Sequence, residues 1–124
     1  MEEKAENSKP YDLEERTFLF AKDVRALLRV LPRTVSNAED ARQLARASGA
    51  VGANYIEAND ALSKKDFLMR AKISRREAKE SRFFLRLLDT SVEESTESTR
   101  QSLVQEALEL VSILSAIIRR AEGT

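Results

Sequence analysis

Carboxylate and amide side chains gather in one short stretch of the chain, where they could do chemistry. Asn54, Glu57, Asn59 and Asp60 lie there, and Asp66 follows after a short gap. Two carboxylates at a suitable distance can act as the acid and the base of a hydrolysis. The alternative is a hydrogen-bonded network that fixes the register of two helices and the turn between them. We favour the network, with Asn54, Glu57, Asn59 and Asp66 as a structural polar motif and no catalytic residue.

Missing residue types narrow the chemistry further. The chain has no histidine and no cysteine, so it lacks the commonest general base, the commonest metal ligand and any thiolate. A di-iron centre in a helical bundle needs Glu-x-x-His pairs, which this chain does not contain. We therefore expect no enzymatic activity, no metal site and no cofactor.

A stripe of basic residues is the second candidate site. On a helical wheel, eight Lys and Arg side chains between residues 64 and 86 fall within an arc of about 120°. This basic stripe consists of Lys64, Lys65, Lys72, Arg75, Arg76, Lys79, Arg82 and Arg86. Spaced along one helix, these cations could contact several phosphates of RNA or DNA. The alternative is a solvated face, or one that pairs with an acidic surface: the N-terminus, the segment 89–97 or a partner protein.

The rest of the chain must position these side chains. Only three glycines and two prolines occur in 124 residues, and 42% of the residues are hydrophobic, which favours long amphipathic helices in one globular domain. Apolar residues recur at helical spacing and predict helices over residues 12–31, 37–61, 64–88 and 98–121. Their short connections predict an all-α fold, an antiparallel up-down four-helix bundle. We expect one domain over residues 1–124, with residues 1–10 as a flexible tail.

Capping residues support three of the predicted helix starts. Asp12, Ser36 and Ser63 each precede a helical pattern and carry a side-chain oxygen that can accept a backbone N–H. Two glycines, Gly49 and Gly52, lie inside the second predicted helix, and each lowers helix propensity by about 1 kcal/mol relative to Ala. We expect the helix to continue through both, because the apolar period is kept across them.

The third predicted helix carries a narrow seam of core positions. Its members step by four and three residues, and they are Phe67, Ala71, Ser74, Ala78, Ser81, Leu85 and Leu88. The middle of this seam consists of small side chains, which allow a neighbouring helix to approach closely. We expect the stretch 48–52 of the second helix to be that neighbour.

Further apolar side chains fall outside these core stripes. On the third predicted helix they are Met69, Ile73, Phe84 and Leu87. On the second, an alanine strip opposite the core face consists of Ala47, Ala50, Ala58 and Ala61. Isolated apolar residues on a surface are ordinary, but several on each helix favour self-association. We therefore expect a homo-oligomer whose interface includes Met69, Ile73, Phe84 and Leu87.

The location of the protein follows from its hydropathy. Lys and Arg together number 21, as do Asp and Glu, so the formal net charge is zero. The sequence suggests no apolar run that spans a bilayer, and the N-terminus is charged rather than signal-like. We expect no membrane contact and a cytoplasmic protein.

Several motifs resemble one known family. They are the runs SGAVGANYIEAND from Ser48, SKKDF from Ser63 and KISRREAKES from Lys72. These runs are similar to those of the four-helix-bundle protein family encoded in intervening sequences of bacterial 23S ribosomal RNA genes, and the resemblance spans residues 11–120. It implies an up-down four-helix bundle, and it gives Asn54 and Glu57 no catalytic role.

The resemblance also implies an assembly and partners. The family is related to the accessory variability determinant of diversity-generating retroelements, a pentameric barrel with a basic surface that partners a reverse transcriptase and nucleic acid. We therefore expect a pentamer that presents the basic stripe to RNA or DNA as an accessory protein. The alternative is a structural or adaptor oligomer that binds only a protein partner.

Overall fold

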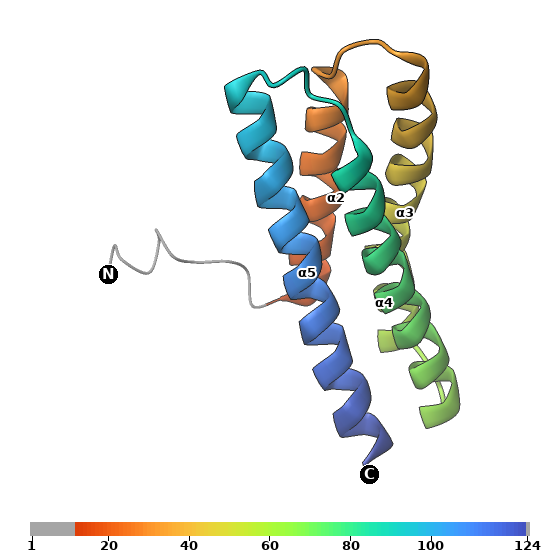
Figure 1. The fold of residues 1–124 in the computed structure, drawn as a ribbon. Helices are drawn as coiled ribbons and strands as arrows, with labels where there is room; N and C mark the ends of the chain where they lie inside the picture. The colour runs from red at the N-terminus through yellow and green to blue at the C-terminus, as the bar shows by residue number, and fades with distance from the viewer. Residues whose placement is uncertain (1–11, 124) are drawn as a thin grey trace.

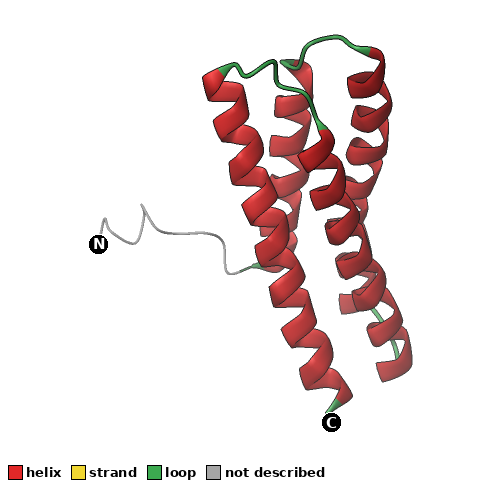
Figure 2. Ribbon diagram, viewed as in Figure 1, coloured by secondary structure: helices red, strands yellow, loops and turns green. Residues whose placement is uncertain are grey.

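The computed structural model describes residues 12–123, and these form four helices joined by short loops. The helices are α2 (Leu13–Arg29), α3 (Val35–Asn59), α4 (Lys64–Leu87) and α5 (Glu94–Glu122). No strand occurs among the described residues (Figure 2). The predicted tail, residues 1–10, lies outside them. The predicted all-α fold is confirmed.

Consecutive helices run in opposite directions, as Figure 1 shows. Contacts between helix ends agree with this: Asn59, which ends α3, donates to Glu14 at the start of α2 (2.9 Å). Each helix packs against its neighbours in sequence, and α2 also packs against α5. The four helices therefore form a closed square. We call the end with the loops 30–34 and 88–93 the upper end, and the end with the turn 60–63 the lower end (Figure 1).

Side-chain caps set the helix starts. Asp12 and Ser63 accept the backbone N–H groups of Glu14 and Asp66, as predicted. The other two predicted starts are wrong. Helix α3 begins earlier because Thr34, rather than Ser36, accepts the N–H of Asn37. Helix α5 begins at Glu94 instead of residue 98, because the Glu93 carboxylate caps a first turn that has no apolar residue to signal it.

The core follows the predicted stripes. Phe20, Val24 and Leu27 of α2 are buried, as are Ala71, Ser74, Ala78, Ser81 and Leu85 of α4. Leu44 and Val51 of α3 join Leu103, Ala107, Leu110 and Leu114 of α5 in the same core. Leu62 keeps the helical spacing of α3 but is 98% exposed, because it lies in the turn after that helix. On α5, Ile118 is buried, whereas Ile117 is partly buried and packs against the core.

The α3–α4 seam is the most extensive contact between helices among the described residues. The Ser74 hydroxyl donates to the carbonyl of Val51 across it (2.7 Å). Ala47 and Ala58 are fully buried beside this seam, so the prediction of an exposed alanine strip is wrong for these two residues. Small side chains on both helices let the backbones approach, and buried methyl groups then fill the space between them.

Helix α3 is continuous through its two glycines, as predicted. Gly52, however, faces α2 and not α4. A Cβ atom at this position would lie 2.8 Å from the Thr17 Oγ1 atom, which is too close for a normal contact. The missing side chain is therefore what lets α2 and α3 meet at Thr17.

Asn37 joins the two loops of the upper end. Its side-chain amide is 3% exposed and donates to the carbonyls of Pro32 (3.0 Å) and Asp89 (2.8 Å). Its Oδ1 atom accepts the N–H of Asp89 (2.9 Å). One buried side chain thus bonds backbone groups of both loops and ties the loops to the start of α3.

Helix α5 contradicts the expectation about apolar runs. By length and composition alone it could cross a membrane, with an 18-residue window of mean hydropathy 1.4. Its fully buried residues nevertheless share one face and pack on the bundle core. A single helix of this kind is weak evidence for a membrane span, because core helices pass the same test, although only 28% of this window is buried.

Candidate nucleic-acid interface

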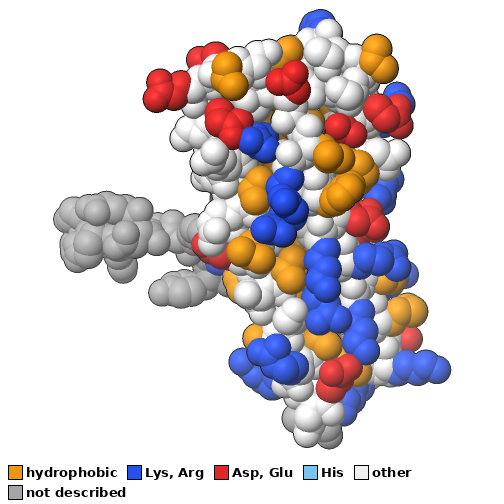
Figure 3. All heavy atoms as spheres, in the orientation of Figure 1, with side chains coloured by type: hydrophobic (Ala, Val, Ile, Leu, Met, Phe, Trp, Pro, Cys, Tyr) orange, Lys and Arg blue, Asp and Glu red, His pale blue; other side chains and the backbone are white. Residues whose placement is uncertain are grey.

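The basic stripe lies on α4, on the flank that faces α5. Six of its cations are exposed, namely Lys64, Lys65, Lys72, Arg76, Lys79 and Arg86, and two are half-buried, namely Arg75 and Arg82. Figure 3 shows Lys and Arg side chains gathered along the middle and lower part of this face, whereas acidic side chains gather at its upper end. From Lys64 to Arg86 the stripe is about 33 Å long at 1.5 Å per residue.

Two of the eight cations form ion pairs. The Nζ atom of Lys72 lies 2.9 Å from a carboxylate oxygen of Glu122, and Arg76 lies 3.8 Å from Glu77. Within residues 12–123 the other six side chains form no ion pair. Arg75 donates instead to the Ser115 hydroxyl of α5 (3.3 Å). Six of the eight cations of the stripe are therefore without an ion pair in the part of the chain that the structure describes.

The acidic segment 89–97 does not pair with the stripe. Its Glu97 binds Arg100, which also donates to the carbonyls of Leu85 and Arg86 at the end of α4. Hydrogen bonds from Arg100, and further ones from Thr90 and Gln101, lower the pKa of Glu97 to about 2. This carboxylate thus stays ionised in a local network of the α4–α5 loop and leaves the cations of α4 uncovered.

Arg82 differs from the rest of the stripe. It is half-buried, and its Nε atom is buried without a hydrogen-bond partner among the described residues. Its guanidinium is therefore held against the protein surface and is not freely solvated. We regard Arg82 as partly structural, and we place the accessible positive charge on its exposed neighbours Lys79 and Arg86.

The predicted polar motif does not form one network. Asn54 accepts a hydrogen bond from Arg70 of α4 (3.1 Å), whereas Asn59 donates to Glu14 of α2. The Glu57 side chain is exposed and makes no hydrogen bond or ion pair with residues 12–123, and Asp66 contributes its backbone N–H to the Ser63 cap. The described part of the chain holds no group of three or more acidic side chains that could bind a metal ion.

Apolar side chains cover the outer face of α4, beside the stripe. Met69 and Leu87 are about half exposed, at 49% and 52%, and Ile73 and Phe84 are half-buried. Phe83, which the sequence interpretation missed, is 55% exposed and meets the Phe84 ring edge to face at 5.2 Å. The predicted interface residues thus lie on one helix face, and two of them are open to a partner.

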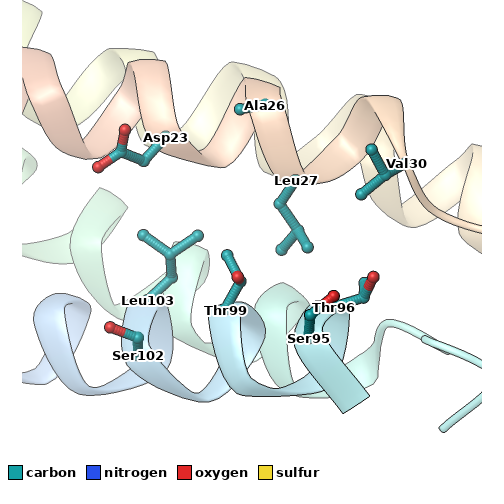
Figure 4. Close-up of a pocket in the computed structure, with 9 residues that line it drawn as sticks. All are labelled: Asp23, Ala26, Leu27, Val30, Ser95, Thr96, Thr99, Ser102 and Leu103. Atoms are coloured by element: carbon teal, nitrogen blue, oxygen red, sulfur yellow. The ribbon is translucent and has the colours of Figure 1, made fainter. Parts of the chain in front are cut away.

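Two clefts lie between helices elsewhere. One, of about 390 Å³, opens between α2 and α5 near the upper end (Figure 4). Leu27 and Leu103 line it together with Asp23 and the hydroxyls of Ser95, Thr96, Thr99 and Ser102. The other, of about 490 Å³, is an apolar groove between α2 and α3 that includes Phe18, Ala53 and Ile56. The exposed apolar surface of the chain is thus not confined to α4.

Comparison with known proteins places the chain in a family. The model of the 23S rRNA-intervening sequence protein family matches residues 10–116. The chain belongs to this family. A solved structure titled as a protein with unknown function from the S23 ribosomal protein family of Bacteroides thetaiotaomicron is similar, with 28% identity and a TM-score of 0.71 over 85% of this chain and 96% of that one. Among curated proteins, none matches the chain.

The motif runs that suggested the 23S rRNA-intervening sequence protein family lie at the α3–α4 seam and the lower turn. The run from Ser48 forms the second half of α3, and the run from Lys72 forms the middle of α4. Their small residues meet across the seam, where Ser74 reaches Val51. These motifs therefore include residues that hold the bundle together, as well as much of the basic stripe.

One buried acid in these motifs was not anticipated. Glu77 is 6% exposed, and Arg46 of α3 lies 3.3 Å from its Oε1 atom while also bonding Glu80. Oε1 itself has no hydrogen bond of good geometry among the described residues. Helical periodicity places Glu77 outside the core seam of α4, and it cannot show that α3 covers this flank of the helix.

Proposed function

We propose that this member of the family is a non-enzymatic, homo-oligomeric accessory protein of the cytoplasm that binds RNA or DNA through the basic stripe of α4. One observation carries the proposal. The stripe presents exposed cations along about 33 Å of helix, and six of its eight members form no ion pair within residues 12–123. A row of unpaired cations with this reach suits a phosphate backbone, since phosphate contacts need charge and spacing but no base recognition.

The exposed apolar surface supports the oligomer. Only 28% of the apolar window of α5 is buried within one chain, and Met69, Phe83 and Leu87 are exposed on α4. A monomer gains nothing from leaving such surface in water, whereas a neighbouring subunit would cover it. The two apolar surfaces lie on different helices. We therefore expect one surface of a subunit to contact the other surface of its neighbour, an arrangement that can close into a ring. The pentamer remains the expectation from the family resemblance.

The first test is binding of labelled single-stranded RNA and DNA across a salt series, with the mass in solution measured in the same buffer. We expect the logarithm of the binding constant to fall linearly with the logarithm of salt, with a slope of about −0.7 for each phosphate neutralised. An assembled protein that binds neither oligonucleotide at low salt would overturn the proposal and favour a protein partner.

A charge-reversal pair of variants assigns the binding to the stripe. The first variant combines Lys65→Glu, Lys79→Glu and Arg86→Glu, which are exposed and unpaired on α4. The matched control combines Lys22→Glu, Arg29→Glu and Arg33→Glu, which are exposed near α2 and make the same change in net charge. We expect both variants to keep the helicity and the assembled mass of the wild type. Only the first variant should lose nucleic-acid binding. Equal losses in both variants would show that total charge, rather than the stripe, drives binding.

A further inference from the structure

An acidic side chain from another helix reaches into the lower end of the basic stripe. Glu122, the last residue of α5, places its Oε2 atom 2.9 Å from the Lys72 Nζ atom. Lys72 lowers the pKa of the Glu122 carboxyl by hydrogen bonding and by charge, and Arg75 and Lys64 add to the effect by charge alone. Three cations of α4 thus act on a single carboxylate of α5.

The geometry around Glu122 is that of an anion site. Lys72 and Arg75 lie one helical turn apart on α4, and Ser115 and Glu122 lie two turns apart on α5. The Ser115 hydroxyl accepts a hydrogen bond from Arg75 and so orients its guanidinium without neutralising it. A carboxylate and a phosphate offer the same kind of acceptor oxygens to Lys and Arg, and the phosphate adds an oxygen. The place that Glu122 fills is therefore suited to a phosphate.

The contact is also weak enough to exchange. The side chains of Lys72 and Glu122 are 47% and 46% exposed. An ion pair of this exposure changes an equilibrium constant by at most about fivefold. A phosphate can replace the carboxylate at this position when other cations of the stripe hold the neighbouring phosphates of the same nucleic acid.

We propose that Lys72 and Arg75 form a phosphate subsite at the lower end of the stripe, and that Glu122 occupies this subsite in the free protein and competes with nucleic acid. The inference rests on the proposed function, since it assigns one subsite and its internal competitor to the same surface. The other cations of the stripe have no competitor within residues 12–123 apart from the Arg76 pairing with Glu77. Glu122 therefore governs only the lower end.

The test compares Glu122→Gln with Glu94→Gln in the full chain. Glu94 is exposed at the opposite end of α5, so both variants remove one negative charge from the same helix. The probe is a fluorescein-labelled single-stranded oligouridylate of about twelve nucleotides, long enough for several phosphate contacts. For Glu122→Gln we expect about fivefold tighter binding at low salt and a salt slope steeper by about 0.7, which corresponds to one more phosphate. For Glu94→Gln we expect neither change.

A double variant shows whether the gain acts through the subsite. Adding Lys72→Gln to Glu122→Gln should abolish the gain, because the freed cation is then missing. If the wild type binds and Glu122→Gln binds no more tightly than Glu94→Gln, the competition is wrong while the proposed function stands. If neither the wild type nor Glu122→Gln binds the oligonucleotide, the proposed function fails and the inference fails with it.

Discussion

The α3–α4 and α2–α5 seams are built in different ways. At α3–α4, Ala47, Ser74 and Ala78 are fully buried, and a side-chain hydroxyl bonds the opposite backbone. At α2–α5, a cleft lined with hydroxyls opens near the upper end, and the link lower down is ionic. There Arg16 of α2 reaches Glu106 at 2.7 Å and Glu109 at 2.8 Å.

The difference shows what each seam tolerates. A seam of small buried side chains has no spare volume, so its stability depends on shape. The α2–α5 seam has a cleft at its upper end, so it can accept a larger side chain there. Its stability depends instead on the charge of Arg16 at its lower end. An added methyl group is therefore expected to destabilise the α3–α4 seam, whereas loss of a cation is expected to destabilise the α2–α5 seam.

The largest contrast comes from the same enlargement made in both seams. Ala78→Leu adds a bulky side chain at a position with 0% exposure, and we expect it to lower the free energy of unfolding by about 3 kcal/mol. Ser102→Leu adds the same side chain beside the α2–α5 cleft and should change stability by less than about 0.5 kcal/mol. Urea unfolding followed by circular dichroism measures both. Similar losses would show that the cleft closes in solution.

The ionic link of the α2–α5 seam gives the next effect. Glu106 and Glu109 raise the pKa of the Arg16 guanidinium, Glu106 more than Glu109, and side-chain exposures of 13% for Arg16 and 15% for Glu106 limit screening by solvent. We expect Arg16→Gln to cost about 2 kcal/mol of unfolding free energy, because two carboxylates lose their shared cation. The loss should persist in about 0.5 M salt, which screens only exposed pairs. A variant as stable as the wild type would mean that the cleft end, and not Arg16, holds α2 to α5.

The two glycines of α3 test the α2–α3 seam on a smaller scale. A Cβ atom on Gly52 would meet Thr17 at 2.8 Å, whereas one on Gly49 would meet only the tip of Arg25 at 3.3 Å. We expect Gly52→Ala to destabilise by about 1 kcal/mol, since the strain exceeds the gain in helix propensity. Gly49→Ala should stabilise by about 0.5 kcal/mol, because a long side chain can move away. Thermal unfolding of the two variants should shift in opposite directions, and equal shifts would contradict the close approach at Thr17.

Much of the fold could be predicted from the sequence, because helical periodicity indicates directly which residues are buried. Phe20, Val24 and Leu27 of α2 recur at helical spacing and are buried, and the seam of small residues on α4 is buried as predicted. The start of α5 was missed because the residues from Glu94 to Ser98 are polar and are held by a cap, not by the core. Asn37 was read as a helix start, since nothing local shows that the loop at Asp89 lies against it.

The candidate site divides in the same way. The basic stripe lies on a single helix, so its spacing sufficed to group its members. The partners Ser115 and Glu122 come from α5, far away in the sequence, and only the fold places them beside Arg75 and Lys72. The polar motif was grouped wrongly for a related reason. Helical periodicity placed Asn54 and Asn59 on the same helix. It could not show that Asn54 faces α4 and Asn59 faces α2.

The hydrogen bonds of Asn37 make the two ends of the bundle mechanically unequal. At the upper end, the two loops separate from α3 only after three hydrogen bonds of the buried Asn37 side chain break. At the lower end, exposed contacts such as that between Lys72 and Glu122 supplement the turn 60–63. Local unfolding is therefore expected to begin at the lower end and to leave the upper end as the last cooperative unit. A ligand that contacts both α4 and α5 near the turn 60–63 would then stabilise the lower end and slow its local unfolding.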